Sequence, residues 1–191
     1  MSKLKIIFVL SCCLASFSAH ALGPVFELGV HSGGDEITTA STTSGEETVT
    51  AGGGVSAAIG LDFNISEDIS AQLLFGKKED SITAVNGNIK FSRNTVDLLF
   101  HLKLNETVYL GAGPTLHSNV KLTSDGVGVY YVQDTDFKDA VGILLDARFD
   151  IGQPDSFFLA IRGTFITYET DTATSFTYNG NSVGLIWGST F

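Results

Sequence analysis

His117, Ser118 and Asn119 place an imidazole beside a hydroxyl, the two groups that nucleophilic catalysis combines. His31 and Asp35 bring a second base close to an acid. Adjacent residues of a strand face opposite sides, so His117 is not expected to orient the Ser118 hydroxyl. One histidine near one aspartate is a common pattern. Neither set predicts a catalytic site.

Three acids lie close together at Asp134, Asp136 and Asp139. They lack the glycine and the distal glutamate of a calcium-binding loop. We therefore expect a solvated acidic face that holds divalent cations only loosely. The sequence predicts no metal site and no cofactor.

Nine further ionisable residues recur on one face of segments that alternate between polar and apolar residues. They are Glu27, His31, Asp62, Arg93, Asp97, His101, Asp146, Arg148 and Arg162. Three arginines, four acids and two histidines can neutralise one another. An unpaired buried charge is costly, so we predict a polar network that fills the interior of the fold.

The elements that carry these residues are predicted strands of alternating pattern. In the segment 53–63, apolar positions alternate with small or polar ones at Val55, Ala57, Ile59, Leu61 and Phe63. With this segment, eight strands are predicted, near 24–32, 53–63, 69–77, 89–104, 108–117, 138–150, 157–168 and from 180 to the last residue.

The connections between these strands alternate in length. Those at 64–68, 105–107 and 152–156 are short, whereas those at 33–52, 78–88, 118–137 and 169–179 are long. Short turns at one rim and long loops at the other are typical of bacterial outer-membrane barrels. The long loops could form a recognition surface.

Folding each short hairpin about its centre tests the strand pattern. The apolar faces then pair Leu61 with Ala71, Leu102 with Leu110, and Phe149 with Leu159; the other faces pair Gly60 with Gln72, His101 with Gly111, and Asp146 with Arg162. A slip of one residue would invert a strand, and none occurs. The fold class predicted is all-β: an eight-stranded antiparallel transmembrane up-and-down β-barrel. The alternative, a soluble lipocalin-like barrel, has its apolar face inside and its charges outside, which is the opposite of the arrangement predicted here.

The first residues have the pattern of a secretory signal peptide. Lys3 and Lys5 precede an apolar stretch over 6–17, and Ala19-His20-Ala21 forms a small-x-small cleavage site. We expect residues 1–21 to be removed and residues 22–191 to form the barrel domain. Lipoprotein processing at Cys12 is the alternative.

Cleavage would remove Lys3, Lys5 and both cysteines. Of 11 Lys and Arg, 9 would then remain against 21 Asp and Glu, so the formal net charge would change from −10 to −12. Such an acidic surface repels nucleic acid. Without cysteine, the mature chain would have neither a disulfide nor a thiolate ligand.

The last segment alternates Val183, Leu185, Trp187, Ser189 and Phe191. Together with this terminal aromatic, the run Tyr109-Leu110-Gly111-Ala112-Gly113-Pro114 resembles the small outer-membrane barrels related to the OmpA barrel, OmpX and OmpW. The resemblance implies a location in the outer membrane and contact with its lipids and lipopolysaccharide. It also implies that Phe191 is part of the signal read by the barrel assembly machinery. An aromatic girdle is predicted near the short turns, at Phe63, Phe100, Phe149, Phe157 and Phe191.

The function expected is a non-enzymatic structural or surface-interaction role, with an extracellular ligand bound by the long loops. A small-solute or ion pore of OmpW type is the alternative. His117-Ser118-Asn119 also resembles the signature of PagL-type lipid A deacylases, but the spacer of that family is missing. A lipid A-modifying hydrolase is therefore the third and weakest hypothesis.

Overall fold

The structure is a computed structural model that describes residues 22–84, 87–126, 132–151 and 157–191. The predicted signal peptide and the predicted short turn at 152–156 lie outside these residues. Every regular element in the described part is a strand, and no helix there is long and apolar enough to cross a membrane. The strands are β1 (Leu22–Ser32), β2 (Glu36–Thr42), β3 (Gly45–Thr50), β4 (Gly54–Asn64), β5 (Ile69–Ala84), β6 (Gly87–Lys103), β7 (Val108–Asp125), β8 (Thr135–Asp136), β9 (Ala140–Ile151), β10 (Phe157–Phe165), β11 (Thr167–Glu169), β12 (Thr177–Asn179) and β13 (Ser182–Thr190).

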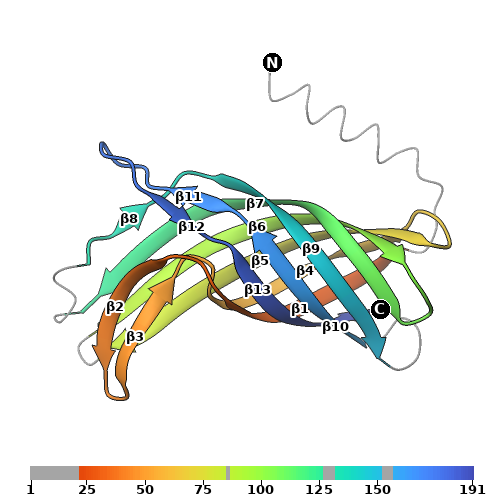
Figure 1. The fold of residues 1–191 in the computed structure, drawn as a ribbon, viewed down its shortest axis with the longest axis horizontal. Coiled ribbons are helices and arrows are strands. Elements are labelled where there is room, and N and C mark those ends of the chain that lie inside the picture. The colour runs from red at the N-terminus through yellow and green to blue at the C-terminus, as the bar shows by residue number, and fades with distance from the viewer. Residues whose placement is uncertain (1–21, 85–86, 127–131, 152–156) are drawn as a thin grey trace.

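Eight of these strands close into a barrel. They pair in the cyclic order β1, β4, β5, β6, β7, β9, β10, β13, and β13 returns to β1 (Figure 1). All of these pairings are antiparallel, and closure leaves no strand edge facing lipid. The predicted eight-stranded up-and-down barrel is confirmed.

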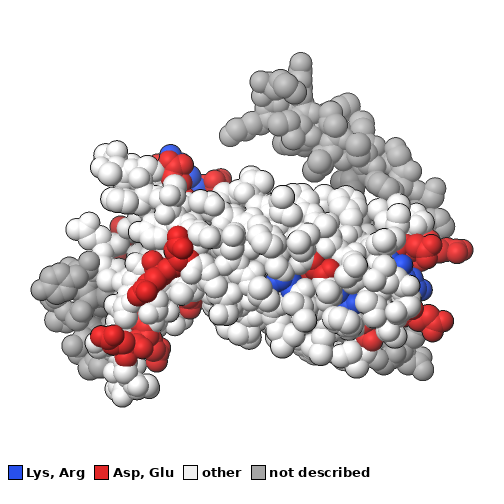
Figure 2. Space-filling model, viewed as in Figure 1, with Lys and Arg blue, Asp and Glu red and all other residues white. Residues whose placement is uncertain are grey.

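The outer face of the barrel is apolar. Val141, Ile143 and Leu145 of β9 are exposed, and the residues between them are buried. Figure 2 shows a middle section with few charges, whereas acidic side chains gather over β2 and β3. Four phenylalanines of the predicted girdle are exposed, and only Phe63 is half-buried; the four are Phe100, Phe149, Phe157 and Phe191.

The predicted loop at 78–88 is wrong. β5 and β6 continue through it as a paired hairpin, in which Lys78 lies opposite Arg93 and Ala84 opposite Gly87. The polar residues that follow Phe75 suggested a loop. These polar residues instead alternate between the outer and the inner face of the barrel. Ile82 and Ile89 are buried and continue the inner face.

The predicted strand pairing is correct for two of the three hairpins with short turns and shifted for the first. Leu102 lies opposite Leu110, and Phe149 opposite Leu159, as predicted. The first hairpin is wrong by two residues, because Leu61 pairs with Leu73 instead of Ala71, and Gly60 with Leu74 instead of Gln72. A shift of two residues keeps every side chain on its predicted face.

A β-bulge divides β7 into two parts. Asn94 pairs with Ser118 and Ser92 with Lys121, so Asn119 and Val120 together oppose one residue of β6. Asn119 has a φ of 51°, in the left-handed region. The extra residue reverses the alternation, so Val120 turns inward where an unbroken strand would turn it outward.

The interior also holds two apolar clusters that the sequence analysis did not predict. One lies among the charged residues of the lumen and comprises Val25, Leu74, Leu99, Leu144, Phe158, Ala160 and Ile186. The other lies toward the long-loop end and comprises Val49, Ala51, Ile82, Ile89, Phe91, Val120, Leu122, Phe137, Ala140, Ile166 and Tyr168. We call the second group the upper cluster.

The long-loop end has its own strand pairs. β2 and β3 form a hairpin within the predicted long connection at 33–52, and β11 pairs with β12. β8 adds a short pairing to the outer part of β7. These elements stand together at one end of the barrel (Figure 1).

Candidate functional site

The centre of the lumen is occupied by an ion cluster around Arg162 of β10. Its Nη1 and Nη2 donate to the two carboxylate oxygens of Glu27, at 2.7 and 3.1 Å, and its Nε donates to Asp146 at 2.7 Å. His101 Nε2 donates to the other Asp146 oxygen at 3.2 Å. All four residues are buried. The cluster joins β1, β6, β9 and β10 across the lumen.

Arg148 forms a second, separate ion cluster. Its Nη1 lies 3.2 Å from Asp62, and its Nε lies 2.7 Å from Asp150. The guanidinium also stacks over the Phe158 ring at 4.1 Å. The sequence analysis did not include Asp150, although its position two residues after Arg148 places it on the same face of β9.

Three other lumen residues lie outside these ion pairs. Asp97 accepts a hydrogen bond from Thr115 Oγ1 at 2.5 Å, and His31 Nε2 lies 2.8 Å from Ser56 Oγ. Arg93 donates from Nη2 to the Gly53 carbonyl at 3.0 Å. Its guanidinium lies over the Phe91 ring, 4.8 Å from the centroid, and belongs to the floor of the upper cluster.

Lys78 is a lumen residue that the sequence analysis missed. Its side chain is buried, and its Nζ donates to Ser182 Oγ at 3.2 Å. Because a loop is predicted at 78–88, Lys78 is not assigned to either face of a predicted strand. Ile82 and Ile89 continue the apolar alternation beyond residue 77. A strand extended on that basis places Lys78 on its inner face.

The residues with possible hydrolytic chemistry are not assembled for it. His117 is buried in the lumen, with Nδ1 hydrogen-bonded to the Tyr168 hydroxyl at 2.6 Å, while Ser118 is on the opposite face of β7. Asp35 accepts a hydrogen bond from the Asn179 amide, so it does not orient His31.

Two of the three acids near the third long loop have local partners. Asp134 accepts a hydrogen bond from the Ser124 amide at 2.8 Å, and Asp136 lies 3.4 Å from Lys121 Nζ. Within the described ranges, no group of three or more His, Cys, Asp or Glu residues is placed to hold a metal ion.

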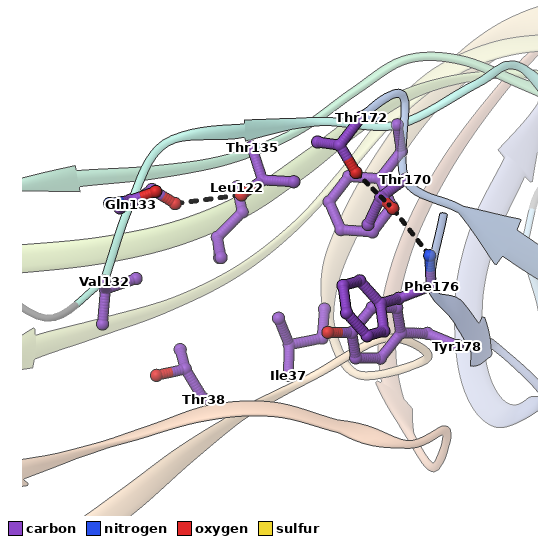
Figure 3. Close-up of a pocket in the computed structure, with 11 residues that line it drawn as sticks. Ile37, Thr38, Leu122, Val132, Gln133, Thr135, Thr170, Thr172, Phe176 and Tyr178 are labelled. Carbon is purple, nitrogen blue, oxygen red and sulfur yellow. Dashed lines mark hydrogen bonds between the residues drawn. The ribbon is translucent and has the colours of Figure 1, made fainter. Parts of the chain in front are cut away.

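A pocket of about 480 Å³ opens among the long loops (Figure 3). We call it the loop pocket. Its walls come from β2, from the outer part of β7 with β8, and from the segment around β11 and β12. None of the described residues that line it is charged; they are Ile37, Thr38, Leu122, Val132, Gln133, Thr135, Phe137, Thr170, Thr172, Phe176 and Tyr178.

Hydrogen bonds hold the walls of the loop pocket. Thr170 Oγ1 accepts from the Phe176 amide at 2.9 Å and lies 3.1 Å from Thr172 Oγ1 (Figure 3). Beside the pocket, Lys138 donates to Glu169 at 2.6 Å. The hydrogen bonds from Lys138 and Ser175 hold the pKa of the Glu169 carboxyl below its usual range.

Phe191 follows β13 directly. Its amide donates to the Pro24 carbonyl at 3.0 Å, and the residue is 77% exposed. The aromatic ring therefore stands on the outside of the barrel, at the rim with the short turns.

An apolar outer face, a closed antiparallel sheet and a charged interior together define a transmembrane β-barrel. The profile of the outer membrane protein beta-barrel domain family matches residues 9–188, and the chain belongs to this family. The protein is accordingly an outer-membrane protein.

Solved structures of similar fold are Neisserial surface protein A and OprG from Pseudomonas aeruginosa. The first is 12% identical, with 92% of this chain and 100% of that chain covered and a TM-score of 0.52. The second is 12% identical, with coverage of 91% and 98% and a TM-score of 0.50. No curated protein matches the sequence at a significant level.

Proposed function

We propose that this protein is a non-enzymatic, non-conducting barrel that serves the outer membrane as a structural and surface-interaction protein. The observation that carries the proposal is the packing of buried side chains inside the barrel. Eight-stranded barrels have interiors that side chains can fill completely. Two layers of packed side chains support closure of this one: the ion cluster around Arg162 and the upper cluster.

The first closure is the ion cluster around Arg162. Glu27 of β1 reaches over β13 to Arg162 of β10, in a bidentate pair that is geometrically specific. A hydrated ion passing this level would have to separate that pair in a buried environment, which is energetically costly.

The second closure is the upper cluster. The rings of Phe91, Phe137 and Tyr168 pack edge to face, with centroids 5.3 and 5.5 Å from Phe91. Water and ions are poorly accommodated by such packing. A solute entering from the loops meets this apolar layer before the ion cluster.

The interaction role rests on the loop pocket and on the ordered strand pairs around it. Its aromatic rings, threonine hydroxyls and Gln133 amide suit an uncharged partner, whereas the acidic β2–β3 hairpin beside it repels anions. We place this end outside the cell and the short turns in the periplasm. The exposed Phe191 ring is proposed to be part of the assembly signal.

Planar-bilayer recording of the purified protein tests the closure. We expect no discrete conductance steps from the wild type, once insertion has been verified by heat-modifiable gel mobility. The matched variant carries Glu27→Ala, Asp146→Asn and Arg162→Ala together, so that the arginine is removed with the charges of both carboxylates that it binds. Discrete, salt-dependent steps from the wild type would overturn the proposal and favour a small-solute pore.

A further inference from the structure

A groove of about 410 Å³ crosses the lipid-facing side of β1, β4, β5 and β6. We call it the lipid-side groove. Phe26, Ile59, Phe75 and Val96 form one row across these four strands, since each is the register partner of the next. Ala57, in the adjacent row, is small and leaves the depression open. Lys77 lines the groove at its long-loop end.

The groove ends where the outer face changes from apolar to charged. Phe75 lies opposite Val96, whereas two residues further along β5 Lys77 lies opposite Asn94. Glu79 and Lys90 follow on the same outward face. The groove therefore lies in the apolar part of the wall, and its upper end meets the region of the lipid headgroups.

Two lysines share one carboxylate at this boundary. Lys77 Nζ lies 3.3 Å from Glu79 Oε2, and Lys90 Nζ lies 3.1 Å from Glu79 Oε1. The lysine side chains are 60% and 43% exposed, and each ammonium group has three N–H donors, so both retain donors for another acceptor.

This excess of cations is unusual for the chain, whose formal net charge is −10. The other ion pairs on the outside of the described barrel each match one lysine with one acid: Lys121 with Asp136, and Lys138 with Glu169. At Lys77 and Lys90, two cations face one carboxylate, and a net positive charge remains.

We propose that Lys77, Lys90 and the lipid-side groove bind a phosphorylated lipid of the outer leaflet. The lipid phosphate accepts hydrogen bonds from both ammonium groups, and an acyl chain lies in the groove along Ala57. Cations immediately above an apolar depression match an amphiphile with an anionic head. This site is separate from the loop pocket; it rests on the orientation proposed above, with the long loops outside the cell, and is independent of whether the lumen is closed.

Native mass spectrometry of the detergent-purified protein tests the site, with bis-phosphorylated lipid A as the probe and the same lipid without phosphates as the comparison. The wild type is expected to prefer the phosphorylated form. Lys77→Ser with Lys90→Ser should weaken its binding roughly tenfold or more. Glu79→Gln should strengthen it, because the competing carboxylate is gone.

Two further variants separate this site from general charge effects. Lys138→Ser removes a lysine from a neutral surface pair and should leave lipid binding unchanged. Ala57→Phe fills the groove from the outside and should weaken lipid binding with both lysines present. Equal binding of the two lipids, or unchanged binding by the double lysine variant, would overturn the proposal. So would inorganic phosphate binding as tightly as the lipid.

Discussion

Arg162 illustrates how a charge is tolerated inside this barrel. Its three guanidinium nitrogens all donate to carboxylates, and one of those carboxylates is also held by His101. Buried ion pairs add little stability by themselves, because desolvation offsets the attraction. Their removal is costly only when a partner stays behind without compensation. The contribution of the cluster can therefore be tested by removing one partner and measuring the free energy of unfolding.

Replacing Arg162 by alanine should lower the free energy of unfolding by roughly 3–5 kcal/mol, because Glu27 and Asp146 are left as uncompensated buried acids. The loss should be smaller when Asp146 is already asparagine, because only one acid then remains unpaired. Urea unfolding followed by the fluorescence of Trp187, the only tryptophan in the chain, measures both values.

A double-mutant cycle with Asp146→Asn isolates the coupling between the two residues. Additive effects would show that Arg162 and Asp146 are energetically independent and would contradict their direct contact. Lys138→Ala, which removes an exposed partner of Glu169, serves as the control and should leave the transition in place.

A contact in the lumen can be predicted from the sequence when a short turn joins its two strands, but not when barrel closure brings the strands together. Asp146 and Arg162 follow from the sequence because one short turn sets their register. Glu27 meets Arg162 only through barrel closure, which depends on strand tilt and stagger and leaves no local pattern. Within the predicted polar network, no local pattern indicates which acid Arg148 binds. Arg148 binds Asp62 in a separate cluster.

The β7 bulge is the element that gives the two halves of the barrel different interiors. Below Asn119, the inward residues of β7 are Thr115 and His117; above it they are Val120 and Leu122. Without the extra residue, Lys121 would face the upper cluster instead of pairing with Asp136 outside. One left-handed residue thus separates a polar layer from an apolar one.

Asn119→Val should destabilise the barrel by about 1–2 kcal/mol, because a β-branched residue is strained at positive φ. Asn119→Gly should be tolerated, since glycine adopts this conformation without a steric penalty. The measurement is the midpoint of urea unfolding. Thr123→Val, on the regular part of β7, is the matched control. Equal effects of valine at 119 and 123 would contradict the strained bulge.

The elements near the short turns could be predicted well, and those near the long loops could not. Short turns constrain register, and membrane burial enforces the alternation beside them. Beyond the apolar belt, outward residues such as Lys77 and Lys90 become polar, so the pattern no longer distinguishes a strand from a loop. The bulge at Asn119 then reverses the pattern itself.

At the scale of the whole molecule, the two ends of the barrel are unlike. One end carries the strands β2, β3, β8, β11 and β12 (Figure 1), the acidic side chains over β2 and β3 (Figure 2) and the loop pocket. The other end has the short turns, with exposed phenylalanines near them. This asymmetry supports the proposed orientation, with the short turns in the periplasm.

Single cysteines test the orientation. Ser44→Cys, between β2 and β3, should react with an impermeant maleimide on intact cells; Glu106→Cys, between β6 and β7, should react only after the outer membrane is permeabilised. The wild type should remain unlabelled, because its two cysteines lie within the proposed signal peptide. The reverse labelling of the two variants would place the short turns outside.

The span of the Arg162 cluster along the chain has a consequence for the order of assembly. Glu27 and Arg162 are 135 residues apart, and β1 meets β13 only when the sheet closes on itself. Pairing of neighbouring strands requires shorter loops to be closed and costs less chain entropy. The contact between Glu27 and Arg162 therefore forms last, whereas Asp146 and Arg162 can pair as soon as their hairpin forms. Until β1 meets β13, the Glu27 carboxylate remains without its arginine.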